Sequence, residues 1–166
     1  MSLCLCGRLF LLSLLRLRLR QDLAAIDVNP DRLSFAPPVS TLEYFQNYRQ
    51  VDIGLDPFPF NGGTTTCDAL WMGVPVVTLR GSTGVGRAGA SILSNAGMPE
   101  LIADSPDAYV ATAKLLATDL PRLARIRSDL RRQMRHSPLM DGAQFARDVE
   151  EAFRWMWRRW CRGGGT

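Results

Sequence analysis

Apolar and polar positions in the middle of the chain alternate between short apolar runs and amphipathic stretches. The apolar runs at 51–55 and 74–79 predict buried strands, and shorter strands are expected at 33–35 and 100–103. Amphipathic stretches predict helices at 40–49, 64–72 and 87–95, followed by three that start near Pro106, Asp119 and Asp141. Strands alternating with helices predict an α/β protein built on a parallel sheet.

The residues between the two longer strands predict an anion site. Pro57 and Pro59 disfavour both helix and strand pairing, so the chain turns after residue 55. Asn61, Gly62 and Gly63 then allow close backbone approach, and Thr64-Thr65-Thr66 opens the next helix. Unpaired N–H groups at a helix start, the helix dipole and three hydroxyls suit a phosphate or diphosphate without a metal.

Asp68 lies four residues after Thr64 and therefore shares its helix face. A carboxylate there would repel phosphate, but it would accept hydrogen bonds from the hydroxyls of a ribose. The alternative is structural: Thr65 and Asp68 would form a capping box, and the glycines would only make a turn. Spacing alone leaves both interpretations open.

The segment LDPFPFNGGTTTCDALWMGVPVVTL at 55–79 resembles the C-terminal catalytic half of the O-linked N-acetylglucosamine transferases and their bacterial and plant SPINDLY-like relatives. The segments RAGAS at 87–91 and GMPELIA at 97–103 fit the same family, as does the amphipathic helix that follows SPL at 137–139. The resemblance extends over residues 30–162. It implies the C-terminal half of a GT-B glycosyltransferase, a Rossmann-like parallel sheet with helices on both faces.

The resemblance also implies roles for single residues. Gly63, Thr64 and Thr65 would contact the diphosphate of UDP, and Asp68 would bind its ribose. The full set of expected donor-binding residues is Asn61, Gly62, Gly63, Thr64, Thr65, Asp68 and Arg87. For Arg87, a surface ion pair is an equally good interpretation.

Three positions depart from the family pattern. Many relatives have a histidine where this chain has Gly63. Thr41 and Tyr44 stand where animal relatives have a lysine and a histidine near the nucleotide. The resemblance therefore implies a donor site without these two nitrogen-bearing side chains.

The function implied is the donor-binding half of an inverting protein O-glycosyltransferase that moves GlcNAc from UDP-GlcNAc to Ser or Thr. Thr64, Thr65 and the helix dipole would stabilise the departing UDP, and no residue is expected to act as a base. The expected partners are the UDP-sugar, a protein acceptor, and an N-terminal catalytic half or helical-repeat chain, without which the chain is expected to be inactive. The alternative is a non-catalytic module that binds nucleotide or pairs with another protein. The sugar, the acceptor and the choice between O- and N-linkage stay open.

Charge and cysteine usage narrow the partners further. The net charge of +4 equals the contribution of four arginines in the first twenty residues, so residues 21–166 are balanced and nucleic acid is not expected. Four cysteines without a C-x-x-C pair and a single histidine, His136, predict a cytoplasmic protein without a metal or other cofactor. His136 is expected at a helix end.

The two ends of the chain carry the remaining predictions. Residues 1–20 form an Arg/Leu-rich leader whose apolar run is too short to span a bilayer. We expect it to be a displaced start that replaces the strand and helix, and the diphosphate lysine, with which the family's domain begins. The UDP-binding domain is then expected at 21–166. The stripe of Phe145, Val149, Phe153 and Trp157 is expected to pack in the core, with a membrane-surface helix as the alternative.

Overall fold

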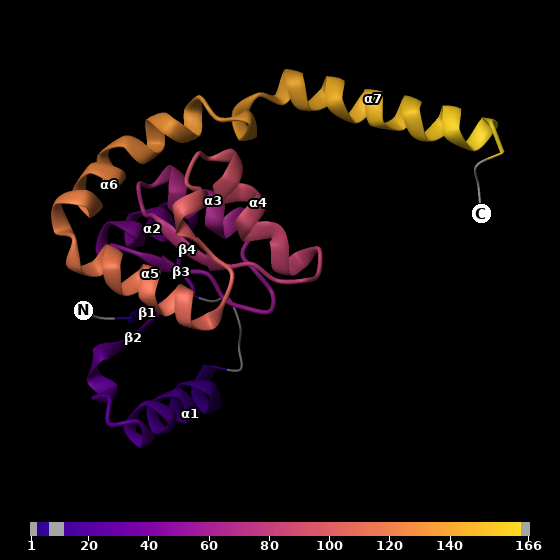
Figure 1. Cartoon of the computed structure of the whole chain (residues 1–166). Coiled ribbons are helices and arrows are strands. Elements are labelled where there is room, and N and C mark those ends of the chain that lie inside the picture. Colours follow the sequence, from indigo (N-terminus) through magenta and orange to yellow (C-terminus); the bar gives the residue numbers. More distant parts are fainter. Residues whose placement is uncertain (1–2, 7–11, 164–166) are drawn as a thin grey trace. The chain divides into compact units, whose positions relative to one another are not determined.

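The computed structural model describes residues 3–6 and 12–163 of the chain. The chain divides into two compact units, Met1–Asn47 and Tyr48–Thr166 (Figure 1). The boundary expected after residue 20 lies inside the first described helix, α1 (Leu12–Ala25). None of the described helices is long and apolar enough to cross a membrane.

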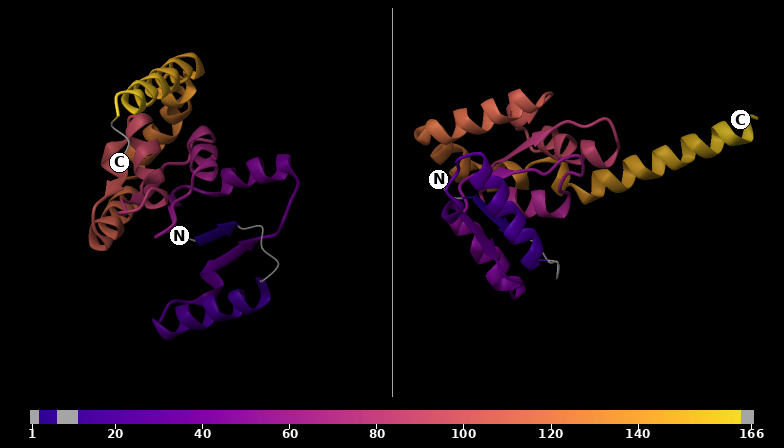
Figure 2. Two further views of the ribbon diagram at one scale, coloured as in Figure 1. Left: turned by 90° about the vertical axis from the view of Figure 1, so that its right-hand side faces the viewer. Right: turned by 90° about the horizontal axis from the view of Figure 1, so that it is seen from below.

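The first unit contains a two-stranded parallel sheet. Strand β1 (Leu3–Cys6) is followed by α1, by the short helix η1 (Pro30–Arg32) and by β2 (Leu33–Ala36). β1 pairs with β2 in a parallel register that sets Leu3 opposite Leu33 and Cys6 opposite Ala36. Figure 2 shows the two strands side by side, with α1 connecting them. Parallel neighbours joined by a helix form a βαβ unit.

This unit corrects the prediction that the leader replaces an opening strand and helix. The described residues of the leader form that strand and the beginning of that helix. The physical reason is local, because the Leu/Arg run from residue 14 consists of good helix formers. Part of the leader, residues 1–2 and 7–11, lies outside the described residues.

Helix α2 (Thr41–Asn47) starts where the sequence predicts. The Glu43 N–H donates to Ser40 Oγ at 3.3 Å, and the Ser40 N–H donates to Glu43 Oε2 at 3.0 Å. This reciprocal pair is a capping box, and it fixes the first turn of the helix.

The second unit is built on three parallel strands in the order β3-β4-β5, namely β3 (Gly54–Leu55), β4 (Val76–Leu79) and β5 (Ile102–Ala103). Helix α3 (Thr64–Trp71) connects β3 to β4. The short helix η3 (Val85–Arg87) and α4 (Ala88–Asn95) connect β4 to β5, with η4 (Pro99–Leu101) just before β5. All strand pairs are parallel, so both connections are crossovers through a helix.

The predicted strand at 51–55 is shorter than expected. Its first residues follow the short helix η2 (Tyr48–Gln50) and pair with an arginine instead of a strand. Arg127 Nη1 donates to Val51 O at 2.6 Å and to Asp52 O at 3.0 Å. Because these carbonyls are satisfied by a side chain from α6 (Leu120–Arg135), the ladder begins only at Gly54.

Helices α5 (Pro106–Thr118) and α6 complete the core of this unit, and both start near the predicted positions, Pro106 and Asp119. Ser105 Oγ accepts the Ala108 N–H at 3.2 Å, and Asp119 Oδ1 accepts the Arg122 N–H at 3.0 Å. The core is formed by apolar side chains from the sheet and four helices. Leu70, Val77, Leu93, Leu116 and Leu130 are among the most deeply buried.

The last helix, α7 (Gly142–Cys161), follows the short helix η5 (Pro138–Met140) and has no buried residue. Phe145, Phe153 and Trp157 are exposed by 67%, 63% and 66%. The predicted core packing of this stripe is therefore wrong for the described chain, because no described element lies over that face. Val149 is half-buried on the same helix.

Candidate functional site

The candidate site lies where two loops follow the carboxyl ends of neighbouring parallel strands. Asp56 continues β3, with its N–H donating to Val77 O at 2.9 Å, and residues 57–63 then lead into α3. The second loop, residues 80–86, follows β4. Ligands in open α/β sheets bind at this edge.

The first turn of α3 is open. Gly63 is its N-cap residue, and no side chain caps the helix. Thr64 and Thr65 are exposed, whereas Thr66 is buried. The capping box proposed for Thr65 and Asp68 is therefore not formed, since Thr65 already lies inside the helix. The Thr66 N–H donates to Gly63 O at 3.1 Å. The first N–H groups of a helix, here those of Thr64 and Thr65, lack an acceptor within the helix and are left for an external one.

Gly62 is held tightly beside this turn. A Cβ on Gly62 would meet Thr66 Oγ1 at 2.5 Å and Thr65 Oγ1 at 2.9 Å. A Cβ on Gly63 would meet nothing within 4 Å. The two glycines are therefore not equivalent: close packing requires the first, whereas the space beside the second is open.

A buried carboxylate supports the loop from behind. Asp56 is 3% exposed, its Oδ1 accepts the Gly62 N–H at 2.7 Å, and its Oδ2 accepts the Thr78 hydroxyl at 2.6 Å. The Tyr109 hydroxyl donates to the backbone oxygen of Asp56 at 3.0 Å. Burial raises the pKa of Asp56, and the hydrogen bonds from Thr78, Gly62 and Asn61 partly oppose that shift.

Sequence reasoning did not single out Asp56. The available signal is an acidic residue placed directly after an apolar strand and before a double-proline turn. Its partner Thr78 is 22 residues away, and no local pattern connects the two.

Asn61 joins the two loops. Its N–H donates to Val85 O at 3.4 Å, and its Nδ2 donates to Pro57 O at 3.1 Å. The side chain is 3% exposed, and Oδ1 has no hydrogen-bond partner among the described residues. Asn61 therefore holds the two loops together. We expect a UDP-sugar to contact the residues beside Asn61 more readily than its side-chain amide.

Arg87 lies on the exposed side of the second loop. Its Nε donates to Gly81 O at 3.3 Å, and the Gly81 N–H donates to Gly86 O at 2.7 Å. Arg87 takes part in none of the ion pairs found among the described residues. The surface ion pair considered for Arg87 is thus not present among the described residues. Instead, the guanidinium bonds to Gly81, near the beginning of the same loop.

Two other residues of α3 bear on the site. Asp68 is half-buried, one turn after Thr64, so the predicted shared face is compatible with the helix as observed. Cys67 is half-buried as well, and burial, followed by the nearby Asp68 charge, raises the pKa of its thiol. A thiol of raised pKa stays protonated at neutral pH and is a poor nucleophile.

The chain matches the family model described as Glycosyl transferase family 41 over residues 15–149. It belongs to this family. A tomato (Solanum lycopersicum) protein, "Probable UDP-N-acetylglucosamine--peptide N-acetylglucosaminyltransferase SPINDLY", is 42% identical over 149 residues, which is 89% of this chain and 16% of that protein. A UDP-N-acetylglucosamine--peptide N-acetylglucosaminyltransferase from Caenorhabditis elegans is 33% identical over 82% of this chain and 12% of its own length.

A solved structure gives the same result for the fold. A mutant O-GlcNAc transferase from Thermobaculum terrenum superposes with a TM-score of 0.89 and 36% identity, covering 99% of this chain and 32% of that one. The α/β expectation with a parallel sheet of the GT-B type is thereby confirmed. The family 41 chain described here spans about a sixth of the length of its curated plant relatives.

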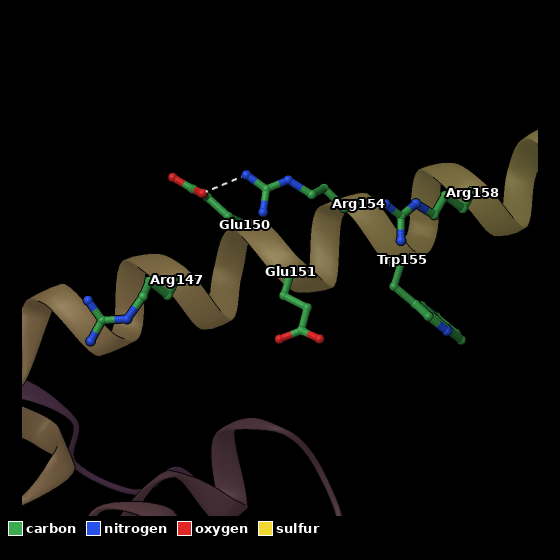
Figure 3. A pocket seen from close by; sticks show the side chains of 6 residues that line it. All are labelled: Arg147, Glu150, Glu151, Arg154, Trp155 and Arg158. Atoms are coloured by element: carbon green, nitrogen blue, oxygen red, sulfur yellow. Dashed lines mark hydrogen bonds and ion pairs between the residues drawn. The ribbon is translucent and has the colours of Figure 1, made fainter.

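The described surface also has a hollow away from the candidate site. This shallow hollow is lined by Arg147, Glu150, Glu151, Arg154, Trp155 and Arg158, all on α7 (Figure 3). Arg154 pairs with Glu150 at 2.9 Å across one turn. Because a single helix supplies every side chain, the hollow has no opposite wall with which to enclose a ligand.

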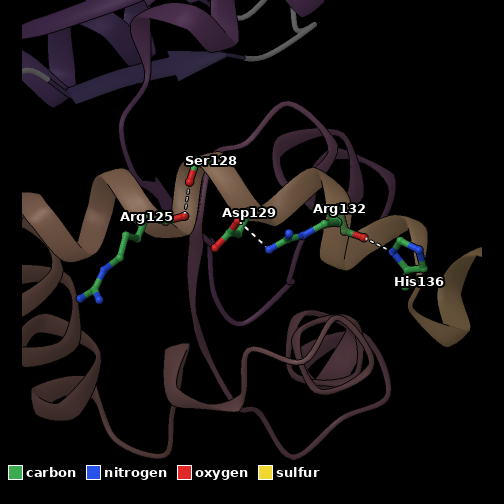
Figure 4. A network of polar contacts seen from close by, with 5 residues as sticks. All are labelled: Arg125, Ser128, Asp129, Arg132 and His136. Atoms are coloured by element: carbon green, nitrogen blue, oxygen red, sulfur yellow. Dashed lines mark hydrogen bonds and ion pairs between the residues drawn. The ribbon is translucent and has the colours of Figure 1, made fainter.

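His136 is confirmed as a helix-end residue. It is the C-cap of α6, and its Nδ1 lies 2.8 Å from Arg132 O (Figure 4). Ser128 and the Asp129–Arg132 pair in the same figure also bond within three residues along this helix. Within the described part of the chain, no three His, Cys, Asp or Glu residues lie close enough together to hold a metal ion.

Proposed function

We propose that this family 41 chain forms the donor-binding part of an inverting protein O-glycosyltransferase that uses UDP-GlcNAc and modifies Ser or Thr. The observation that carries the proposal is the open first turn of α3, with exposed Thr64 and Thr65, at the carboxyl edge of a parallel sheet. The relatives' names support the choice of donor and of a peptide acceptor.

The chemistry follows from charge. As the bond between the sugar's anomeric carbon and UDP breaks, negative charge develops on the leaving diphosphate. Backbone N–H groups, the Thr64 and Thr65 hydroxyls and the dipole of α3 would stabilise that charge. The acceptor oxygen would attack from the opposite face, which inverts the anomeric centre. Its proton needs a base, and none is assigned within this chain. Asp68 would accept from the ribose hydroxyls, and Arg87 would keep the second loop beside the donor.

We further propose that no metal takes part in donor binding. The helix start provides positive potential where metal-dependent transferases place a cation. UDP titrated into the chain should show the same dissociation constant with and without EDTA. An affinity that collapses on chelation and returns with Mg²⁺ or Mn²⁺ would contradict this proposal.

The 166-residue chain by itself is expected to bind donor without transferring the sugar. Productive transfer needs an acceptor held in line as well as a stabilised leaving group. The exposed aromatic face of α7 is a candidate surface for the partner that would supply acceptor contacts, since apolar patches of this kind mark interfaces.

A cytoplasmic location stays a prediction from cysteine usage.

Labelled UDP-GlcNAc and a mixed protein acceptor pool test the proposal. The purified chain should transfer nothing alone, and it should transfer sugar when mixed with the remaining part of the Thermobaculum relative. The same remaining part without this chain is the control. UDP binding with no transfer in any mixture would favour the non-catalytic module, and robust transfer by the chain alone would contradict its assignment as a donor half only.

A further inference from the structure

The buried carboxylate of Asp56 lies at a junction of three elements. Its side chain bonds the loop before α3 through Gly62 and bonds β4 through Thr78. Its backbone oxygen receives the hydroxyl of Tyr109 from α5. A carboxylate costs several kcal/mol to bury unless donors surround it, and here both oxygens have one.

The carboxylate of Asp56 is closely packed against the first turn of α4. A Cβ on Gly89, in the first turn of α4, would collide with Asp56 Oδ2 and with the Thr78 hydroxyl. The backbone of α4 therefore passes directly over the carboxylate. Thr78 itself is fully buried, so Asp56 Oδ2 faces protein and not solvent.

The bond to Gly62 sets the geometry of the turn that follows it. The Gly62 N–H points inward to Asp56 Oδ1 at 2.7 Å, which fixes the plane of the Asn61–Gly62 peptide. Gly62 also packs against the hydroxyls of Thr65 and Thr66, so a rotation of this peptide would displace the first turn of α3. The N–H groups after Gly62 belong to that turn and have no side-chain cap.

We infer that Asp56 is a positioning residue: by holding the Gly62 N–H and the Thr78 hydroxyl, it aims the uncapped first turn of α3 at an anion. The inference rests on the proposed function, because the anion it serves is the diphosphate of the donor. In this role Asp56 would act on the anion only through Gly62 and the turn that follows it. A purely structural role predicts lost stability alone, whereas positioning predicts lost affinity in a chain that stays folded.

Position 78 offers a matched pair of variants. Thr78→Val keeps the shape of the side chain and removes the hydroxyl donor to Asp56, and Thr78→Ser keeps the donor. Calorimetric titration with UDP should show an affinity about tenfold lower for Thr78→Val, with Thr78→Ser near the parent value. Circular dichroism and urea unfolding check that each variant is folded. A folded Thr78→Val with unchanged affinity overturns the inference.

A double-mutant cycle adds a measurement that stability does not move. Replacing Thr64 and Thr65 by Val in the parent should lower its UDP affinity. In the Thr78→Val background the same replacement should lower UDP affinity by a factor about threefold smaller, because the first turn of α3 is already displaced. Additive losses overturn the inference.

Amide NMR separates this inference from the proposed function. Thr78→Val should shift the Gly62, Thr64 and Thr65 amide resonances and leave those of α6 in place, whether or not UDP binds. If the parent binds no UDP, the proposed function fails, and unmoved Thr64 and Thr65 amides would then overturn the positioning role independently.

Discussion

Three consecutive threonines have different environments at the start of α3. Thr64 and Thr65 are exposed, and Thr66 is buried beside Gly62. Two hydroxyls are therefore available to a ligand, and the third helps to shape the turn. The helix start at these residues was predictable from the glycines and threonines in sequence. The support from Asp56 was not, because its partners Thr78 and Tyr109 are 22 and 53 positions away.

The two glycines before α3 give a prediction at this scale. Gly62→Ala should lower UDP affinity about tenfold or more, because the new methyl group meets two threonine hydroxyls. Gly63→Ala is the matched control, since its methyl group enters open space. Titration of both variants with UDP measures the difference. Equal affinities for the two variants would show that the turn is not the binding element.

Tyr109 gives a prediction for alkaline pH. Burial, and then the charge of Asp56, raises the pKa of Tyr109 from 10.0 to about 12. A raised pKa means that the folded chain holds this proton more tightly than the unfolded chain does. The stabilising contribution is therefore complete below pH 10 and is lost as the pH rises through about 12.

Tyr109→Phe isolates this contribution. The free energy of unfolding of the parent should exceed that of the variant near neutral pH, and the difference should shrink from pH 10 upward. Urea unfolding at a series of pH values measures it. A difference that stays constant or grows above pH 10 would contradict the assigned environment of the Tyr109 hydroxyl.

At the scale of elements, local chemistry explains which predictions held. Helix starts at Ser40, Ser105, Asp119 and Asp141 were predictable because each residue caps the turn that follows it. The shortened strand before Gly54 was not, since it depends on Arg127, more than seventy positions away. Periodicity also identifies an apolar helix face without saying what will cover it, which is why α7 was assigned to the core.

The exposed stripe of α7 supplies the prediction for elements. Replacing Phe153 and Trp157 together by Gln should change the free energy of unfolding by less than about 0.5 kcal/mol per site, because both side chains are exposed. It should also reduce self-association of the chain, which analytical ultracentrifugation measures.

Leu130→Ala on α6 is the control for a core position. Leu130 is 0% exposed, and its truncation should cost about 2–5 kcal/mol. If the α7 double variant lost as much stability as Leu130→Ala in urea unfolding, the stripe would be packed as the sequence first suggested.

At the scale of the whole molecule, we propose that the chain binds the donor of a sugar transfer and not the acceptor. It has an uncapped helix start and two exposed threonines, which we propose bind a diphosphate, and it covers 32% of the length of its solved family 41 relative. The α/β class and family could be predicted from one segment of 25 residues, whereas the βαβ unit at the N-terminal end could not. There, the strand Leu3–Cys6 is only four residues long and pairs with Leu33–Ala36, about thirty positions away, so no local pattern identifies it.

The most direct test is a calorimetric titration of UDP into the parent chain and into the chain with Thr64 and Thr65 both replaced by Val. Thr118→Val, at the end of α5, is the control for the same chemical change away from the site. We expect the parent and the control to bind UDP alike, and the double variant to bind about tenfold or more weakly, since hydrogen bonds to a charged group are worth about 1.5–3 kcal/mol each. Equal UDP affinity in all three folded chains would contradict the assignment of the donor site to α3.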